Sequence, residues 1–219
     1  MTLALVAVGW GLVGAAGGWF VRWGSVRLAR LEELEPGNRS WQVYGPLILA
    51  ALLFAAFAYH MGAVPLLLLR SVFVLVLVQV IFFDFEHRLI LDRVMFPAMA
   101  LALLASLFSS TRLIFEWQDP PWWAGIATGI GAGVLFLLLA VGGSLLFKAD
   151  AMGFGDVKLV MFLGFLLGPL ATAYALFYGV LLAALASIGV IIRNRSVKGT
   201  LAYGPYLAAG ALIMLFKGT

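Results

Sequence analysis

The sequence contains long stretches of almost purely apolar residues, and these limit what the chain can fold into more than any other feature. A bilayer core about 30 Å thick is crossed by a helix of roughly 20 apolar residues. Backbone groups in lipid must satisfy one another, so such stretches are expected to be helices. About eight stretches qualify: Leu3–Val21, Tyr44–His60, Val64–Phe83, Val94–Phe108, Ala124–Phe147, Val157–Gly168, Leu170–Ile192 and Leu201–Phe216. The predicted fold class is therefore an all-α polytopic membrane protein with about eight transmembrane helices.

The composition agrees with this interpretation. Of the 219 residues, 64% are hydrophobic and only 11% are charged, whereas soluble domains carry about 25% charged residues. The absence of cysteine excludes a disulfide scaffold, a thiol nucleophile and a cysteine-ligated metal site. The first stretch lacks a positively charged segment before it and is too long for the core of a signal peptide, so we expect a permanent helix.

The positively charged residues are distributed unevenly between the two sides of the predicted membrane. If the N-terminus is outside, one side receives nearly all lysines and arginines, and the other receives only Arg112 and Lys217. Cytoplasmic loops carry an excess of these residues, so the sequence predicts an outside N-terminus. This topology accounts for the net charge of +4 without a nucleic-acid partner, and the lipid bilayer is the expected environment.

Two aspartates lie where apolar stretches are predicted to meet water. Asp84 follows the third stretch, and Asp156 precedes the sixth, at the end of Gly153-Phe154-Gly155-Asp156. The predicted topology brings both to the same face of the membrane. Two neighbouring carboxyl groups share one proton, because they cannot both ionise cheaply. Such a pair activates water and polarises a scissile carbonyl, which is the chemistry of an aspartyl protease and needs no metal.

Other residues near these aspartates have both functional and structural interpretations. The two glycines of the quartet allow a helix or an extended substrate to come close. Asp156 is also suited to stabilising a helix dipole, and Asp92 to capping the fourth helix. His87 is expected to be solvated at the interface. Lys158, two residues after Asp156, is interpreted as a lipid or substrate contact.

Four segments of the sequence resemble one known family. The segment Gly153–Leu159 is similar to the signature of type IV prepilin peptidases, membrane aspartyl proteases of the Gly-x-Gly-Asp class. Asp84–Arg93 resembles the family's other aspartate motif, with Leu91 in place of the usual proline. Tyr203–Leu207 resembles the run before the family's last helix, and Gly18–Phe20 resembles an element near its start.

The resemblance implies a function and a set of site residues. The implied activity is an endopeptidase that removes the short basic leader of type IV prepilins or pseudopilins at the cytoplasmic face of the inner membrane. Asp84 and Asp156 map to the catalytic pair, and Gly153, Gly155 and Lys158 to motif and substrate-positioning roles. Nearby Glu86 and Asp150 are candidates to attract the basic leader.

The chain departs from the longer members of that family between its first two helices. Those members carry a cytoplasmic domain there, with two Cys-x-x-Cys pairs that bind zinc and are linked to N-methylation of the product. Here the Arg22–Val43 segment is short and lacks cysteine, so no zinc site is expected. No cofactor is expected for proteolysis, and use of S-adenosylmethionine is not implied. We predict an N-terminal helix pair over residues 1–60 and a six-helix protease core over residues 61–219.

Several alternatives remain open on the sequence alone. One is a bifunctional prepilin peptidase and N-methyltransferase, and another is a presenilin-like intramembrane protease, which shares the Gly-x-Gly-Asp motif. A different class is a transporter that uses the acids as a proton relay. A non-catalytic scaffold of a type IV pilus or protein secretion assembly is the remaining alternative.

Overall fold

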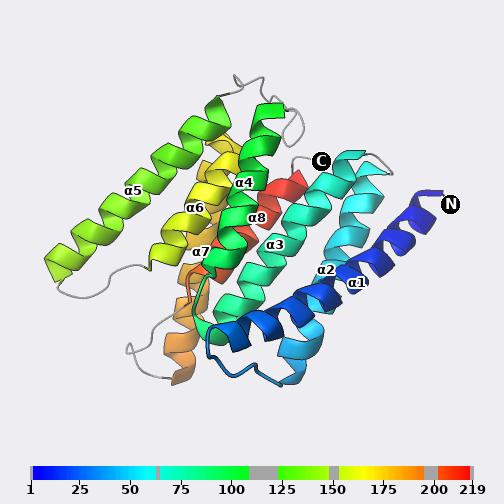
Figure 1. Cartoon of the computed structure of the whole chain (residues 1–219), viewed down its shortest axis with the longest axis horizontal. Coiled ribbons are helices and arrows are strands. Elements are labelled where there is room, and N and C mark those ends of the chain that lie inside the picture. Colours follow the sequence, from blue (N-terminus) through cyan, green and yellow to red (C-terminus); the bar gives the residue numbers. More distant parts are fainter. Residues whose placement is uncertain (1, 63–64, 109–122, 148–152, 195–201, 218–219) are drawn as a thin grey trace. The chain divides into compact units, whose positions relative to one another are not determined.

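The computed structural model describes residues 2–62, 65–108, 123–147, 153–194 and 202–217. Within these residues the chain forms eight helices and no strand (Figure 1). The helices are α1 (Thr2–Leu31), α2 (Ser40–Met61), α3 (Pro65–His87), α4 (Asp92–Phe108), α5 (Ala124–Phe147), α6 (Phe154–Leu167), α7 (Pro169–Asn194) and α8 (Gly204–Lys217). The all-α fold predicted from the apolar stretches is confirmed.

Five of the described helices are long and apolar enough to cross a membrane. These are α1, α2, α3, α5 and α7. The other three are shorter, with 17 residues in α4 and 14 residues in each of α6 and α8. The protein is therefore a multi-pass membrane protein, as the sequence predicts.

Two helix boundaries show how local sequence sets the elements. The predicted break between the sixth and seventh stretches is confirmed: α6 ends at Leu167, Gly168 adopts a positive φ of 73°, and α7 begins at Pro169. Proline suits a first helical position because its missing N–H has no partner to lose. By contrast, α1 does not end at Val21 as predicted but continues to Leu31. Its extension is rich in leucine, arginine and alanine, which favour helix even where the chain is polar.

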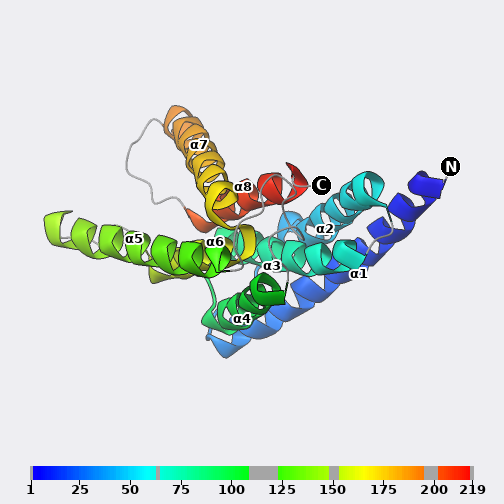
Figure 2. The ribbon, with the colours of Figure 1, turned by 90° about the horizontal axis from the view of Figure 1, so that it is seen from above.

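The chain divides into two compact units, Met1–Arg88 and Leu89–Gly218. In the first unit, α1 packs along α2, and both helices contact α3 (Figure 2). Its core contains the buried side chains of Phe54, Phe57 and Phe73. One polar contact inside the unit joins two helices: the Ser25 hydroxyl of α1 donates to the Gln79 side-chain oxygen of α3 at 3.0 Å. The predicted division into residues 1–60 and 61–219 concerns functional domains and stays a prediction.

In the second unit, α6 is the central helix. It contacts α4, α5, α7 and α8 (Figures 1 and 2). Most of its residues are buried, including every residue from Phe162 to Leu167. The contact with α5 is so close that a Cβ on Gly164 would lie 2.5 Å from the Cα of Gly129. Tight packing thus holds most of α6, and the first turn of this helix carries Asp156.

Candidate active site

Asp84 lies near the carboxyl-terminal end of α3 and is 5% exposed. The helix ends soon after it: the Arg88 N–H donates to the Asp84 carbonyl at 2.8 Å, and Arg88 adopts a positive φ of 54°. A positive φ in a residue other than glycine is uncommon and takes the chain out of the helix. The structure therefore places a buried carboxyl group in the last turn of an apolar helix.

Glu86, two residues after Asp84, is bound within the first unit. Its side chain is 6% exposed and accepts a hydrogen bond from Arg22 of α1 at 3.3 Å. Glu86 also accepts a hydrogen bond from the Gly37 N–H, and Arg22 donates to the Gly37 carbonyl. Both carboxylate oxygens are thus engaged, and they join the α1–α2 loop to the end of α3. Attraction of a basic leader by Glu86 stays a prediction, and this burial argues against it.

The environment of His87 differs from the expected solvated interface. Its side chain is 9% exposed, and its Nε2 lies 3.3 Å from a carboxylate oxygen of Glu86. The imidazole ring lies against the ring of Phe83, with 4.7 Å between the centroids. The sequence did not predict this burial, because His87 is the last residue of α3 and the helix period alone does not show what covers it.

Asp156 lies in the first turn of α6, and Gly153 directly precedes the helix. Burial raises the pKa of Asp156 from 3.8 to about 6, while a backbone hydrogen bond from Gly153 acts in the opposite direction. Desolvation raises the pKa of a carboxyl group because it penalises the charged form. Asp156 is therefore suited to keeping a proton at a pH where an ordinary aspartate has lost it.

The two glycines of the quartet have different surroundings. A Cβ on Gly155 would lie 2.8 Å from the Cβ of Ile90, a residue of the short connection before α4. A Cβ on Gly153 would meet nothing closer than an Asp156 carboxylate oxygen at 3.7 Å, which is an ordinary contact. The structure thus shows a close approach at Gly155, where Ile90 packs on the quartet. Approach of a substrate to Gly153 stays a prediction.

Lys158 is bound to α4. Its ammonium lies 2.5 Å from a carboxylate oxygen of Asp92 and 5.2 Å from the ring centroid of Phe96. Asp92 is the first residue of α4, and the preceding Leu91 carbonyl accepts the first helical hydrogen bonds, so Asp92 is not the expected cap. The sequence did not reveal the pair, because Asp92 and Lys158 lie on separate helices far apart in the chain.

The predicted catalytic residues belong to different units. Asp84 lies in the first unit and Asp156 in the second, so their pairing stays a prediction. Asp150, the other candidate for attracting a leader, lies outside the described residues. In the described part of the chain, no group of three histidine, aspartate or glutamate side chains is gathered to hold a metal ion.

Comparison with known proteins shows the family. Residues 71–188 match the type IV leader peptidase family. The chain belongs to this family. It is 31% identical over 175 residues to the prepilin leader peptidase/N-methyltransferase of Bacillus subtilis (strain 168), covering 78% of this chain and 64% of that protein. It is 32% identical over 177 residues to the protein of the same name from Aeromonas hydrophila, covering 78% of this chain and 57% of that protein. No solved structure matches the chain.

The family match includes both predicted catalytic aspartates and the Asp92–Lys158 pair. Asp84, Asp92, Asp156 and Lys158 all lie between residues 71 and 188. The chain spans less than two thirds of the length of the two relatives, so the match concerns the part that they share.

Proposed function

We propose that this member of the type IV leader peptidase family is an aspartyl endopeptidase that removes the short basic leader of type IV prepilins or pseudopilins. The observation that carries the proposal is the family match over residues 71–188, which includes both Asp84 and Asp156. The relatives are named prepilin leader peptidase/N-methyltransferase, which supports the same substrate class.

The proposed chemistry gives the two aspartates different roles. The raised pKa of Asp156 suits it to be the protonated partner, and Asp84 is then the ionised one. Asp84 takes a proton from a water molecule, whose oxygen attacks the scissile carbonyl carbon. Asp156 donates its proton to the carbonyl oxygen, which gives a tetrahedral diol. When the C–N bond breaks, Asp84 passes its proton to the leaving amine, and one hydroxyl of the diol returns a proton to Asp156, which restores the starting states of both carboxyl groups.

The chain's connectivity supports this pairing. Four residues, Arg88–Leu91, connect the end of α3, which carries Asp84, to the start of α4. Within the second unit, Ile90 of this connection contacts Gly155, and Asp92, the first residue of α4, contacts Lys158. The chain segment that follows Asp84 therefore packs against the start of α6, which carries Asp156.

We further propose that the site faces the cytoplasm in the inner membrane and that the N-terminus is outside. The distribution of lysine and arginine supports this orientation. With the eight helices taken as successive crossings, α3 ends and α6 begins on the same side, which is the side of the lysine- and arginine-rich loops. A prepilin helix then remains in the bilayer while its leader reaches the two carboxyl groups.

Methylation of the product is a separate question within the same function. The names of the relatives include N-methyltransferase, so S-adenosylmethionine is a candidate cosubstrate for this chain as well. This chain has no cysteine, and its first two helices are joined by a short loop. We propose that proteolysis does not depend on methylation.

Incubation of the purified protein with a prepilin in lipid vesicles tests the proposal. The expected product has lost the mass of its leader, and it is formed with or without S-adenosylmethionine. The Bacillus subtilis relative serves as the positive control. An unchanged prepilin under conditions where the control cleaves it would contradict the proposed activity. A gain of one methyl group with S-adenosylmethionine would show that this chain performs both activities.

A further inference from the structure

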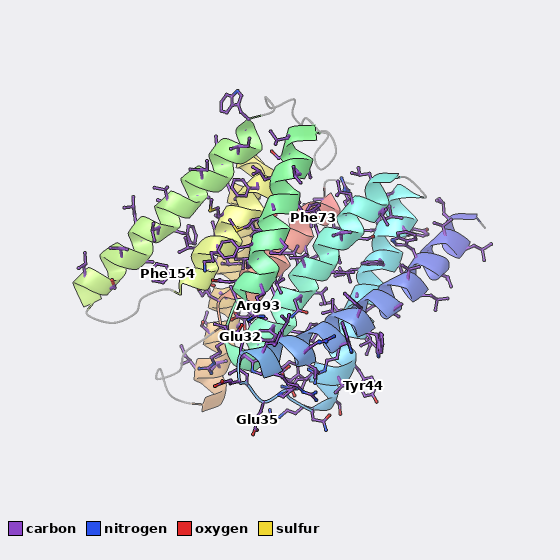
Figure 3. The ribbon with its side chains drawn as sticks, viewed as in Figure 1. Glu32, Glu35, Tyr44, Phe73, Arg93 and Phe154 are labelled. Atoms are coloured by element: carbon purple, nitrogen blue, oxygen red, sulfur yellow. The ribbon has the colours of Figure 1, made fainter. Side chains whose placement is uncertain are left out.

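The first turn of α6 is attached to the rest of the second unit differently from the remainder of the helix. Phe154, its first residue, is 65% exposed, whereas the helix is almost wholly buried further along. Figure 3 labels Phe154 at this end of the helix. Residues near the start of α4 make two contacts with the first turns of α6. Ile90 packs on Gly155, and the Lys158 ammonium is held by Asp92 and Phe96.

Lys158 makes a second contact with α4 in addition to its ion pair with Asp92. Asp92 and Phe96 are four residues apart on α4, so a carboxylate and an aromatic face lie on the same side of that helix. The ammonium contacts both, at 2.5 Å and 5.2 Å, and thereby connects α6 to the first turn of α4. We call Asp92, Phe96 and Lys158 the α4–α6 clamp.

We infer that the α4–α6 clamp is a positioning device for Asp156, and that Lys158 acts through α4 instead of contacting lipid or substrate. The inference rests on the proposed function. Lys158 follows Asp156 by two residues in the same helix, so a shift of the first turn moves the carboxyl group with it. A displacement of about 1 Å in a catalytic group is enough to slow a reaction on the order of 100-fold.

Because the Lys158 and Asp92 side chains are partly exposed, an effect of their contact on positioning can be distinguished from an effect on stability. The Lys158 and Asp92 side chains are 28% and 55% exposed. Ion pairs this accessible contribute little to the free energy of unfolding, because water screens the attraction and ordering two side chains costs entropy. Loss of the clamp should therefore change the rate of cleavage much more than the stability of the fold.

The kinetic test uses Lys158→Met, Asp92→Asn, their double variant, and the exchanged pair Asp92→Lys with Lys158→Asp. Each single variant should lower kcat about tenfold and leave KM within about twofold, since positioning acts on the reacting groups. The double variant should be no slower than either single variant, and the exchanged pair should recover most of the lost rate. Lys217→Met is the matched control, because Lys217 also contacts an aromatic ring, that of Tyr178, and should keep full activity.

Three kinetic outcomes would overturn the inference. One is single-variant effects that multiply in the double variant, which would mean that the residues act independently. The second is a rise in KM with kcat unchanged, which is the signature of a substrate contact. The third is an exchanged pair as slow as the single variants.

A structural readout separates this inference from the proposed function. If the wild-type protein fails to cleave, the proposed function fails, and hydrogen exchange still tests the clamp. Amide exchange of Lys158, Leu159 and Val160 should be faster in Asp92→Asn than in the wild type and return toward wild type in the exchanged pair. Equal exchange in Asp92→Asn and wild type would refute the clamp whatever the activity.

Discussion

Replacing Gly155 by alanine tests the contact between the quartet and the segment before α4. The new Cβ would lie 2.8 Å from the Cβ of Ile90, whereas carbon atoms in contact are about 3.5–4.0 Å apart. The opposing Ile90 Cβ is bonded directly to the backbone and does not move when the side chain rotates. Either the Ile90 backbone or the first turn of α6 must therefore move by about 1 Å. A displacement of that size should lower kcat by roughly 10- to 100-fold.

The expected cost in stability is smaller than the cost in rate. Overpacking of this kind costs about 1–3 kcal/mol, and the higher helix propensity of alanine returns up to about 1 kcal/mol. Gly153→Ala is the matched control, because its Cβ would lie 3.7 Å from the nearest neighbouring atom, a carboxylate oxygen of Asp156, and Gly153 has ordinary extended backbone angles. It should retain activity within about threefold, since no group is displaced.

The assay is steady-state cleavage of a prepilin by both variants in the same lipid, with thermal unfolding measured in parallel. The double variant Gly155→Ala with Ile90→Gly removes the opposing Cβ and should recover part of the lost rate. Equal activity of the Gly155→Ala and Gly153→Ala variants would refute the steric argument. A Gly153→Ala variant slower than Gly155→Ala would show that the outer glycine contacts substrate directly.

Three further predictions concern pH and orientation. The rate of cleavage should follow a bell-shaped pH profile, and chelators should not change the rate. The alkaline limb of the profile should lie at or above the Asp156 pKa of about 6. A rate that rises steadily through pH 8 would contradict this prediction. Because that pKa is raised from 3.8, the folded state binds more protons than the unfolded state between pH 3.8 and about 6, and stability falls as the pH rises through this window. Asp156→Asn should therefore raise the melting temperature relative to wild type above pH 6 but not below pH 4, and an equal change at both pH values would be evidence against the raised pKa. Single cysteines introduced at the exposed Asn38 and at Ser110 should report the orientation of the chain in the membrane. An impermeant thiol reagent applied to intact cells should label position 110 and not position 38. The reverse pattern would refute the topology.

The sequence was informative about the helices because lipid imposes one requirement on every spanning segment. Any apolar run of sufficient length must form a helix, so the runs predicted eight helices and the break at Gly168. The same reasoning misplaced the end of α1, since hydropathy detects contact with lipid and not helix formation. Arg27, Leu28 and Ala29 continue the helix because their side chains favour it, although the segment is polar.

The candidate site was predictable only in part, for a reason that lies in tertiary contacts. The Gly-x-Gly-Asp quartet indicates Asp156 because the pattern is local in the chain. The partners of Lys158 and Glu86 come from other helices or from a loop, and neither the helix period nor the composition encodes such contacts. The different surroundings of Gly153 and Gly155 likewise depend on Ile90, which reaches the motif from a distant part of the sequence.

The central claim is that Asp84 and Asp156 together perform the hydrolysis. The most direct measurement is the mass spectrum of a prepilin after incubation with purified wild-type protein, Asp84→Asn and Asp156→Asn. Asparagine keeps the size of each side chain but can neither carry the negative charge nor exchange the proton that the mechanism requires. The wild type should give mature pilin, and both variants should leave only uncleaved prepilin, with all three proteins folded in the membrane. Mature pilin from either asparagine variant at the wild-type rate would contradict the central claim.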